Sequence, residues 1–246
     1  MRRAAEAAPA FLYLPDLRRR PATFTLAGDE AHYLIRVVRA RESERVRATD
    51  GAGLVATLRV EHARGEPELH VEAMREVARP APARLLCGAP EGERGDWLVE
   101  KLAELGVTDL VPVDTDRVSW PAASRGPRWE RLAAAALRQS RSAWRLAIHP
   151  AAPLEEAVAA ASSDVRWLAD ATGEPAGVAT FQPESSLIGA VGPSSGFSDR
   201  ERELLLAAGF APVRLGPYRL RTETAAVALA SHWAARRPQS CAVSEP

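Results

Sequence analysis

The chain has 246 residues, 46% of them hydrophobic, which is enough to build one large domain or two ordinary ones without disulfide or metal support. Its 32 basic and 32 acidic residues cancel to a formal net charge of zero. Bulk charge therefore neither supports nor excludes a nucleic-acid partner, which a local basic surface would have to hold.

Cysteine and lysine are both rare in this sequence. Cys87 and Cys241 are too few for a disulfide framework or a cysteine metal site, so we expect a reducing compartment and no metal. Lys101 is the only lysine, and nearly all positive charge is therefore arginine, which binds phosphate bidentately and stacks on bases. Abundant Ala, Arg, Gly and Pro together also indicate a GC-rich genome, so the number of arginines alone does not indicate function. The first residues lack the apolar core of a signal peptide, and no stretch reaches membrane-spanning length, so we expect a cytoplasmic protein.

Short strands dominate the first part of the chain, after a flexible extension expected over 1–10. The strands are expected at residues 11–14, 45–49, 54–60 and 69–77. Among them, Gly28 opens a helix that is predicted to carry Leu34, Val37 and Val38 on its apolar face. This pattern predicts a small β-barrel domain over 11–78 with one inserted helix.

The segment Arg79-Pro80-Ala81-Pro82 interrupts this pattern, because its prolines remove backbone donors and disfavour helix in the residues before them. Beyond it, strands and helices alternate, which predicts a parallel sheet covered by helices. The strands are expected at 85–87, 110–113, 165–168, 187–191 and 213–215, and the helices at 97–105, 128–139, 154–161, 198–209 and 222–236. We therefore expect an α/β domain over 79–238 and a flexible tail over 239–246.

Two glycine-bearing loops, residues 192–196 and 215–224, follow predicted strands of this domain. In open α/β sheets, ligands bind at the carboxyl ends of the strands. Glycine also lets backbone N–H and C=O groups approach a ligand closely enough to read an adenine edge or a ribose hydroxyl. Both loops are candidates to bind a nucleoside, although loops of this kind are also common as ordinary turns.

The segment Gly192-Pro193-Ser194-Ser195-Gly196 also matches the G-x-S-x-G pattern of serine hydrolases. In those enzymes the helix starts directly after the serine, whereas here a capping box delays it to Ser198. Glu223 and His232, the available acid and histidine, would lie on opposite faces of one helix, roughly 13 Å apart along it. We therefore interpret the serines as loop residues that donate hydrogen bonds.

The last helix begins in a dense group of polar residues, in which Thr222 and Thr224 alternate with Arg221 and Glu223. A threonine cap and a glutamate in the first turn are ordinary helix features. Arg219 and Arg221, in contrast, stand at the positive end of the helix dipole, where arginine is unfavourable unless an anion lies near. A phosphate, or a uridine that is losing its N3 proton, would satisfy them.

In their order along the chain, these motifs resemble the RsmE-type 16S rRNA uridine-N3 methyltransferases of the knotted SPOUT class. The matching segments are Phe11-Leu12-Tyr13-Leu14-Pro15, Glu30-Ala31-His32, Val37-Val38-Arg39, Asp50-Gly51, residues 100–107, Gln139-Ser140, Gly192-Pro193, Leu215-Gly216 and residues 219–225. The resemblance implies a PUA-like RNA-binding barrel, a methyltransferase domain with a trefoil knot, and a homodimer whose active site lies at the subunit interface. It also implies S-adenosyl-L-methionine as methyl donor and 16S rRNA of the small ribosomal subunit as substrate.

The resemblance assigns roles to individual residues. Those expected to bind the methyl donor are Leu168, Gly192, Pro193, Ser194, Gly196, Leu215, Gly216, Tyr218, Leu220, Thr222 and Thr224. Arg221 is the first catalytic candidate, because its guanidinium would stabilise the ionised uracil. Glu223 is the second, either as proton acceptor or as a structural residue of the first turn. RNA is expected to contact His32, Arg36, Arg39 and Arg219.

One departure from the family pattern concerns the methyl-donor loop. The family usually has an acidic residue followed by glycine after Gly-Pro, where this chain has Ser194-Ser195. The missing carboxylate puts methyl-donor affinity in question and leaves open a ribosome-associated RNA-binding protein of the same fold that has lost catalysis. A knotted methyltransferase acting on tRNA is a third interpretation.

Overall fold

The computed structural model describes residues 10–19, 21–63, 65–90, 94–120, 126–176, 182 and 184–236. The expected flexible tails lie outside these residues, except for Ala10, and so does Cys241. The described chain forms two compact units: residues up to Arg79 join Leu137–Trp144 in the first, while Pro80–Ala136 and the residues from Arg145 onward form the second. Within this part of the chain, no helix combines the length and the apolar character needed to cross a bilayer.

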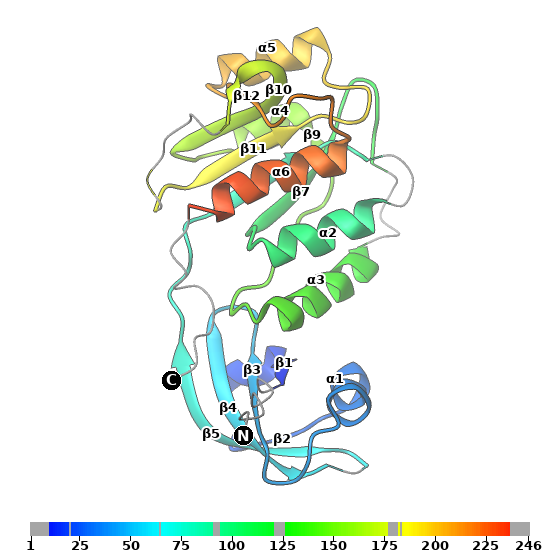
Figure 1. Cartoon of the computed structure of the whole chain (residues 1–246), viewed down its shortest axis with the longest axis vertical. Coiled ribbons are helices and arrows are strands. Elements are labelled where there is room, and N and C mark those ends of the chain that lie inside the picture. The colour runs from blue at the N-terminus through cyan, green and yellow to red at the C-terminus, as the bar shows by residue number, and fades with distance from the viewer. Residues whose placement is uncertain are drawn as a thin grey trace, which may run out of the picture. The chain divides into compact units, whose positions relative to one another are not determined.

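A curled five-stranded sheet forms the first unit (Figure 1). Its order is β1 (Phe11–Tyr13), β3 (Arg45–Thr49), β4 (Leu54–His62), β5 (Glu68–Glu76) and β2 (Thr23–Thr25). The pairs are antiparallel except for β1 with β3. Leu12, Leu58 and Leu69 are fully buried inside the curl. The predicted strands are confirmed, whereas β2 and the short helix η1 (Pro15–Arg19) were not predicted.

The inserted helix begins at Gly28 as predicted, but its exposed and buried faces differ from the prediction. It runs as α1 (Gly28–His32) and continues as a π-helix, η2 (Tyr33–Val38). Leu34 is buried and Val38 is partly buried, whereas Val37 is 62% exposed. A π-helix bonds residue i to i+5 and has a wider turn, so side chains are not placed at the α-helical spacing on which the prediction relied.

Residues Leu137–Trp144 belong to the first unit, although the segment begins within the last turn of helix α3 (Gly126–Ser140), whose earlier residues belong to the second unit. Leu137 is buried with Phe11 and Val55. Arg138 forms an ion pair with Glu30, whose pKa is raised by burial despite that pair. Sequence periodicity carried no sign of this arrangement, because the segment reads as the end of an ordinary helix.

The second unit is built on a parallel sheet in the order β12-β10-β11-β6-β7-β8, with β9 paired to β7 (Figure 1). The strands are β6 (Ala83–Cys87), β7 (Asp109–Asp114), β8 (Ala147–Ile148), β9 (Ala152–Pro153), β10 (Val165–Pro175), β11 (Leu187–Val191) and β12 (Ala211–Arg214). Every residue of β11 is buried, as expected of a central parallel strand covered on both faces. The predicted parallel α/β sheet is therefore confirmed, and among the strands of the described residues only the two-residue strands β8 and β9 were missed.

Helices cover both faces of this sheet. They are α2 (Arg94–Glu104), α3, α4 (Leu154–Ala159), α5 (Asp199–Ala207) and α6 (Thr222–Ala234). One buried cluster joins α2, α3 and α6 to the sheet through residues such as Leu98, Trp129 and Leu229. A second joins α4 and α5 to the other face through Leu154 and Leu205. The three-layer arrangement leaves the carboxyl edge of the sheet to the connecting loops.

Both predicted ends of helix α5 are confirmed. Ser198 is the N-cap, and its capping box with Glu201 is complete in both directions. Gly209 adopts a left-handed φ of 83°, and the N–H of Phe210 donates to the carbonyl of Leu205 at 3.0 Å. This is the geometry of a Schellman motif, which needs a residue that tolerates positive φ at the position of Gly209.

Candidate active site

The carboxyl ends of β10, β11 and β12 enclose an open cleft of about 570 Å³. Its lining consists of residues 168–171, 191–194, 196, 197, 202, 213–220, 222 and 225. The two glycine loops therefore face one cleft, and its volume lies in the range of small-molecule sites.

Almost all residues predicted to bind the methyl donor line this cleft. They are Leu168, Gly192, Pro193, Ser194, Gly196, Leu215, Gly216, Tyr218, Leu220 and Thr222. Thr224 does not: its side chain is exposed on the first turn of α6, away from the lining. Arg219, predicted to contact RNA, also lines the cleft, and Tyr218 is 83% exposed at its rim.

Hydrogen bonds tie the two loops to one another. The hydroxyl of Thr222 donates to the carbonyl of Gly192 at 3.0 Å, and Arg219 Nη2 donates to the carbonyl of Ser194 at 2.9 Å. The expected threonine cap is therefore wrong: the N-cap of α6 is Arg221, without a capping side chain, because Thr222 is used to hold the other loop. These bonds hold the backbone of the first loop in place without any acidic side chain at Ser194.

Close packing at Gly88 also positions the first loop. Gly88 follows β6, and its N–H donates to the carbonyl of Val191 at 2.8 Å. A Cβ on Gly88 would lie 2.5 Å from the nitrogen of Pro193, so only glycine allows the two chain segments to approach this closely. Sequence reasoning missed this residue, because its role depends on a contact between distant segments.

A charged group that sequence reasoning also missed lies on the β10 side of the cleft. Strand β10 extends beyond its predicted end at 168, with a register shift between Ala169 and Glu174. Within this shift, Asp170 forms a 2.7 Å ion pair with Arg202. Burial tends to raise the pKa of Asp170, but hydrogen bonds from Thr172 and Arg202 outweigh it and lower the pKa below its ordinary value. This wall of the cleft therefore carries a carboxylate that is already paired.

The two catalytic candidates occupy different environments at the start of α6. Arg221 is exposed, with an extended backbone, beside the positive end of the helix. Glu223 is only 5% exposed, and its carboxylate lies 3.4 Å from Nε of Arg94 at the start of α2. Neither lines the cleft, but only Arg221 is accessible to a substrate placed beside it.

The structure gives no support to a serine nucleophile at Ser194. Helix α5 begins at Asp199 after its N-cap Ser198, five residues beyond Ser194, so the strand–elbow–helix joint of hydrolases is not formed. Ser194 instead lines the cleft, and its carbonyl accepts the bond from Arg219. The interpretation of this segment as a ligand-binding loop is the one that agrees with its geometry.

The other residues predicted to contact RNA lie in the first unit. His32, Arg36 and Arg39 are all exposed along α1, η2 and the residue that follows. Arg39 ends the π-helix in a left-handed conformation with a φ of 57°. Their exposure is compatible with RNA contact, and the role itself stays a prediction.

Comparisons with known proteins identify the family of the chain. A family model described as an RNA methyltransferase domain matches residues 78–234, and one described as an RNA methyltransferase PUA domain matches residues 26–73. The ribosomal RNA small subunit methyltransferase E of a Synechocystis species is 31% identical over 221 residues, covering 85% of this chain and 72% of that protein. The protein of the same name from Mycobacterium bovis is 31% identical over 232 residues, covering 87% of each.

Solved structures show the same fold. A probable rRNA methyltransferase from Porphyromonas gingivalis is 29% identical, with a TM-score of 0.81 and coverage of 93% of this chain and 98% of that one. The ribosomal RNA small subunit methyltransferase E of Neisseria gonorrhoeae, solved bound to S-adenosyl methionine, is 26% identical, with a TM-score of 0.80 and coverage of 91% and 96%. The chain therefore belongs to the ribosomal RNA small subunit methyltransferase E family of RNA methyltransferases.

Proposed function

We propose that this protein transfers a methyl group from S-adenosyl-L-methionine to N3 of a uridine in 16S rRNA. The observation that carries the proposal is the cleft at the carboxyl edge of the sheet, which is formed by both glycine loops. The names of the relatives and the methyl donor bound to the Neisseria structure support the reaction class.

The cleft suits a nucleoside-sized ligand that is recognised largely by backbone groups. Its volume is about 570 Å³, and residues 192–194, 196 and 215–220 of the two glycine loops contribute to its lining. A Cβ on Gly216 would meet no atom within 4 Å, so the space beside this backbone is open to a ligand. When bound there, S-adenosyl-L-methionine would supply an electrophilic methyl group on a sulfonium.

Arg221 is the residue that we assign to the uracil. Uracil N3 carries a proton, and a guanidinium beside it favours the ionised base, which is the better nucleophile. The N-terminus of α6 adds partial positive charge at the same place. We assign Glu223 to a structural role, because its carboxylate is buried and paired with Arg94.

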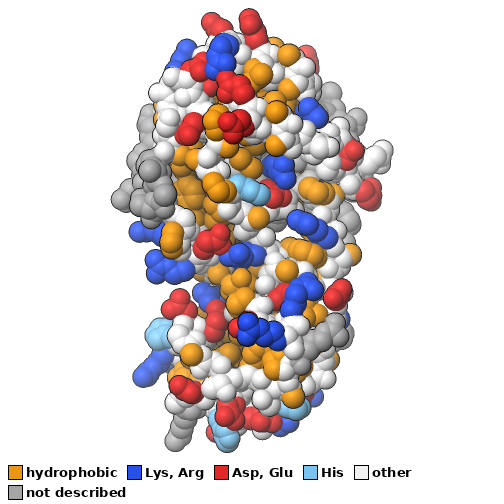
Figure 2. Space-filling view, turned by 180° about the vertical axis from the view of Figure 1, so that it is seen from behind, with side chains coloured by type: hydrophobic (Ala, Val, Ile, Leu, Met, Phe, Trp, Pro, Cys, Tyr) orange, Lys and Arg blue, Asp and Glu red, His pale blue; other side chains and the backbone are white. Residues whose placement is uncertain are grey.

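Contact with RNA is proposed for local groups of arginine and histidine. Basic and acidic side chains are interspersed over the face shown in Figure 2, in keeping with a net charge of zero. His32, Arg36 and Arg39 are exposed in the first unit and would hold an irregular or single-stranded segment, from which a uridine is most easily unstacked.

We further propose action in the cytoplasm, the domain limits 11–78 and 79–238, a trefoil knot, and a homodimer with its active site at the subunit interface.

A second candidate function is that of a ribosome-associated RNA-binding protein without catalysis. It is motivated by Ser194-Ser195, which stand where the family usually has an acidic residue and glycine. Against it, the carbonyls of Gly192 and Ser194 are held by Thr222 and Arg219, so the loop does not need a carboxylate to keep its place. Calorimetry separates the two: the enzyme binds one S-adenosyl-L-methionine per chain, and the alternative shows no binding at millimolar concentration.

Methylation of purified 16S rRNA, followed by mass spectrometry of its nucleosides, tests the proposal. The wild-type protein is expected to produce 3-methyluridine in 16S rRNA and not in tRNA. Arg221→Ala should lower the transfer rate by about 100-fold, as loss of one charge-stabilising donor does elsewhere, while methyl-donor affinity stays near that of the wild type. Arg131→Ala, at an exposed arginine of α3 outside the cleft lining, is the matched control and should keep full activity. An unchanged rate in Arg221→Ala would remove Arg221 from the mechanism.

A further inference from the structure

Arg117 lies in a closed turn that follows β7, outside the cleft lining. The N–H and the hydroxyl of Thr115 both donate to the carbonyl of Val118, at 3.0 and 2.8 Å. The N–H of Val118 donates back to the hydroxyl of Thr115 at 3.1 Å. Residues 115–118 thus form a compact turn, which we call the β7 turn, and Arg117 projects from it with its side chain exposed.

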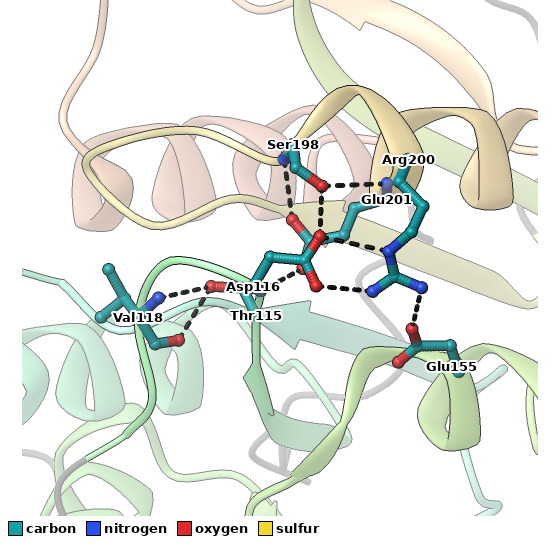
Figure 3. A network of polar contacts seen from close by, with 7 residues as sticks. All are labelled: Thr115, Asp116, Val118, Glu155, Ser198, Arg200 and Glu201. Carbon is teal, nitrogen blue, oxygen red and sulfur yellow. Dashed lines mark hydrogen bonds and ion pairs between the residues drawn. The ribbon is translucent and has the colours of Figure 1, made fainter.

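A polar network holds the β7 turn against the start of α5 (Figure 3). Asp116 accepts hydrogen bonds from Ser198 at 2.6 Å and from Arg200 at 2.5 Å, and its own N–H donates to Glu201 at 2.8 Å. Bonds from Arg200 and Ser198 lower the pKa of Asp116, so its carboxylate stays charged at neutral pH. Arg200 also pairs with Glu155 of α4, which extends the network to a third element.

Arg117 and Arg219 converge on the first glycine loop from two different elements. Arg117 Nη1 donates to the carbonyl of Ser195 at 2.8 Å, and Arg219 Nη2 donates to the carbonyl of Ser194 at 2.9 Å. Consecutive Cα atoms are about 3.8 Å apart, so the two guanidinium groups are anchored one peptide from each other. Both side chains are exposed, at a loop whose residues Ser194 and Gly196 line the cleft.

These two guanidinium groups differ from that of Arg202, an arginine of the cleft lining. Arg202 forms an ion pair with Asp170, whereas among the described residues neither Arg117 nor Arg219 forms an ion pair with a carboxylate. Arg117 lies close enough to Asp116 to help lower its pKa, but that carboxylate is already bonded to Arg200. Each guanidinium has five N–H donors and uses one on the loop, so most of its donors are available to an external anion.

We propose that Arg117 and Arg219 form a clip that binds the RNA backbone phosphates beside the target uridine. The inference rests on the proposed function, because the ligand is the RNA that this site methylates. A nucleotide turned out of its stack places its flanking phosphates at the mouth of the pocket that receives its base. Carbonyl bonds hold both guanidinium groups in advance, so less side-chain freedom is lost when phosphate binds.

Phosphate on RNA is the ligand that the chemistry favours over the methyl donor. S-adenosyl-L-methionine has no phosphate, and its sulfonium is repelled by guanidinium groups, although its carboxylate is an anion. Arg117 lies outside the cleft lining, and both arginines are exposed. Binding of RNA should therefore weaken when Arg117 is removed, while binding of the methyl donor should not.

Salt dependence of RNA binding tests the clip, with the full chain and a 16S rRNA fragment that the wild-type protein methylates. The logarithm of the observed association constant, Kobs, decreases linearly with the logarithm of the salt concentration. The magnitude of this slope should be smaller by about 0.7 in Arg117→Ala and in Arg219→Ala, and by about 1.4 in the double variant, as expected for lost phosphate contacts on single strands. Arg117→Lys keeps the charge and should restore most of the slope. Affinity of Arg117→Ala for S-adenosyl-L-methionine, measured by calorimetry without RNA, should stay within about twofold of the wild type, because Arg117 lies outside the cleft lining.

The matched control is Arg166→Ala, because Arg166 also donates to a backbone carbonyl, that of Ala208 at 2.6 Å, but near the amino end of β10. Its slope should equal that of the wild type. Wild-type slopes in the alanine variants of the clip, an equal fall in Arg166→Ala, or a loss of methyl-donor affinity with RNA binding intact would each overturn the clip. If the wild-type protein methylates none of the 16S rRNA offered, the proposed function fails, and the clip loses its basis with it.

Discussion

Replacement of Gly88 by alanine should weaken methyl-donor binding while the protein stays folded. The added Cβ would lie 2.5 Å from the nitrogen and 2.6 Å from Cδ of Pro193, whereas ordinary contact begins at 3.4 Å, so the loop must retreat by about 0.9 Å. Gly88 cannot withdraw easily, because its N–H is bonded to the carbonyl of Val191 at 2.8 Å. The displacement therefore falls on residues 192–196, which contribute to the cleft lining.

Overpacking of this kind costs about 1–3 kcal/mol. The unliganded variant relaxes by moving the loop, and binding must bring the loop back, so the dissociation constant for S-adenosyl-L-methionine should rise by about 5- to 150-fold. Calorimetry measures the affinity, and thermal unfolding confirms that the variant is folded. Gly126→Ala is the matched control, because a Cβ there meets no atom within 4 Å. A Gly88→Ala protein that binds the methyl donor as tightly as the wild type would refute the role given to this contact.

Three further outcomes are expected. Gly216→Ala should leave stability unchanged, because its Cβ meets no atom within 4 Å, yet weaken methyl-donor binding by at least about tenfold, since the methyl group occupies ligand space; equal affinity by calorimetry would contradict this. Glu223→Gln should lower the free energy of unfolding in urea by about 1–2 kcal/mol, because the ion pair with half-exposed Arg94 is lost. The transfer rate of this variant should fall less than tenfold, whereas the loss of a general base would lower it by about 100-fold or more. Burial raises the pKa of the Cys87 thiol to about 12, so iodoacetamide at pH 8 should leave Cys87 unmodified in the folded protein. The free energy of unfolding should decline as the pH rises from about 9, the ordinary pKa of a cysteine thiol, through 12. Rapid alkylation of Cys87, found by peptide mapping, would disprove this.

Elements whose signals are local could be predicted from the sequence. Helix α5 is the clearest example, because Ser198, Glu201 and Gly209 each act on neighbouring residues and so define its ends. The strands of the parallel sheet were also predicted, since buried β11 reads as a continuous apolar run. Short pieces such as β8 and β9 were missed, because two residues carry no periodicity. Val37 was assigned to the wrong face because nothing in its spacing distinguishes a π-helix from an α-helix.

In the candidate site, too, features with local sequence signals could be predicted, and features that depend on long-range contacts could not. The two glycine loops could be found because they follow predicted strands, and parallel strands end at one edge of a sheet. Arg117 could not, because its partner Ser195 is 78 residues away and only the folded chain brings them together. The burial of Glu223 against Arg94 was equally invisible, since a first-turn glutamate reads the same whether it is free or paired. Local sequence signals thus predict the position of the cleft, whereas only the long-range contacts of the folded chain show which side chains around it are already paired.

The most direct measurement of the central claim is the nucleoside content of 16S rRNA from cells that lack this gene. Mass spectrometry should find 3-methyluridine absent from the deletion strain, restored by the wild-type gene, and not restored by one that encodes Arg221→Ala. Undiminished 3-methyluridine in the deletion strain would contradict the account, because methylation of that uridine would then not depend on this protein.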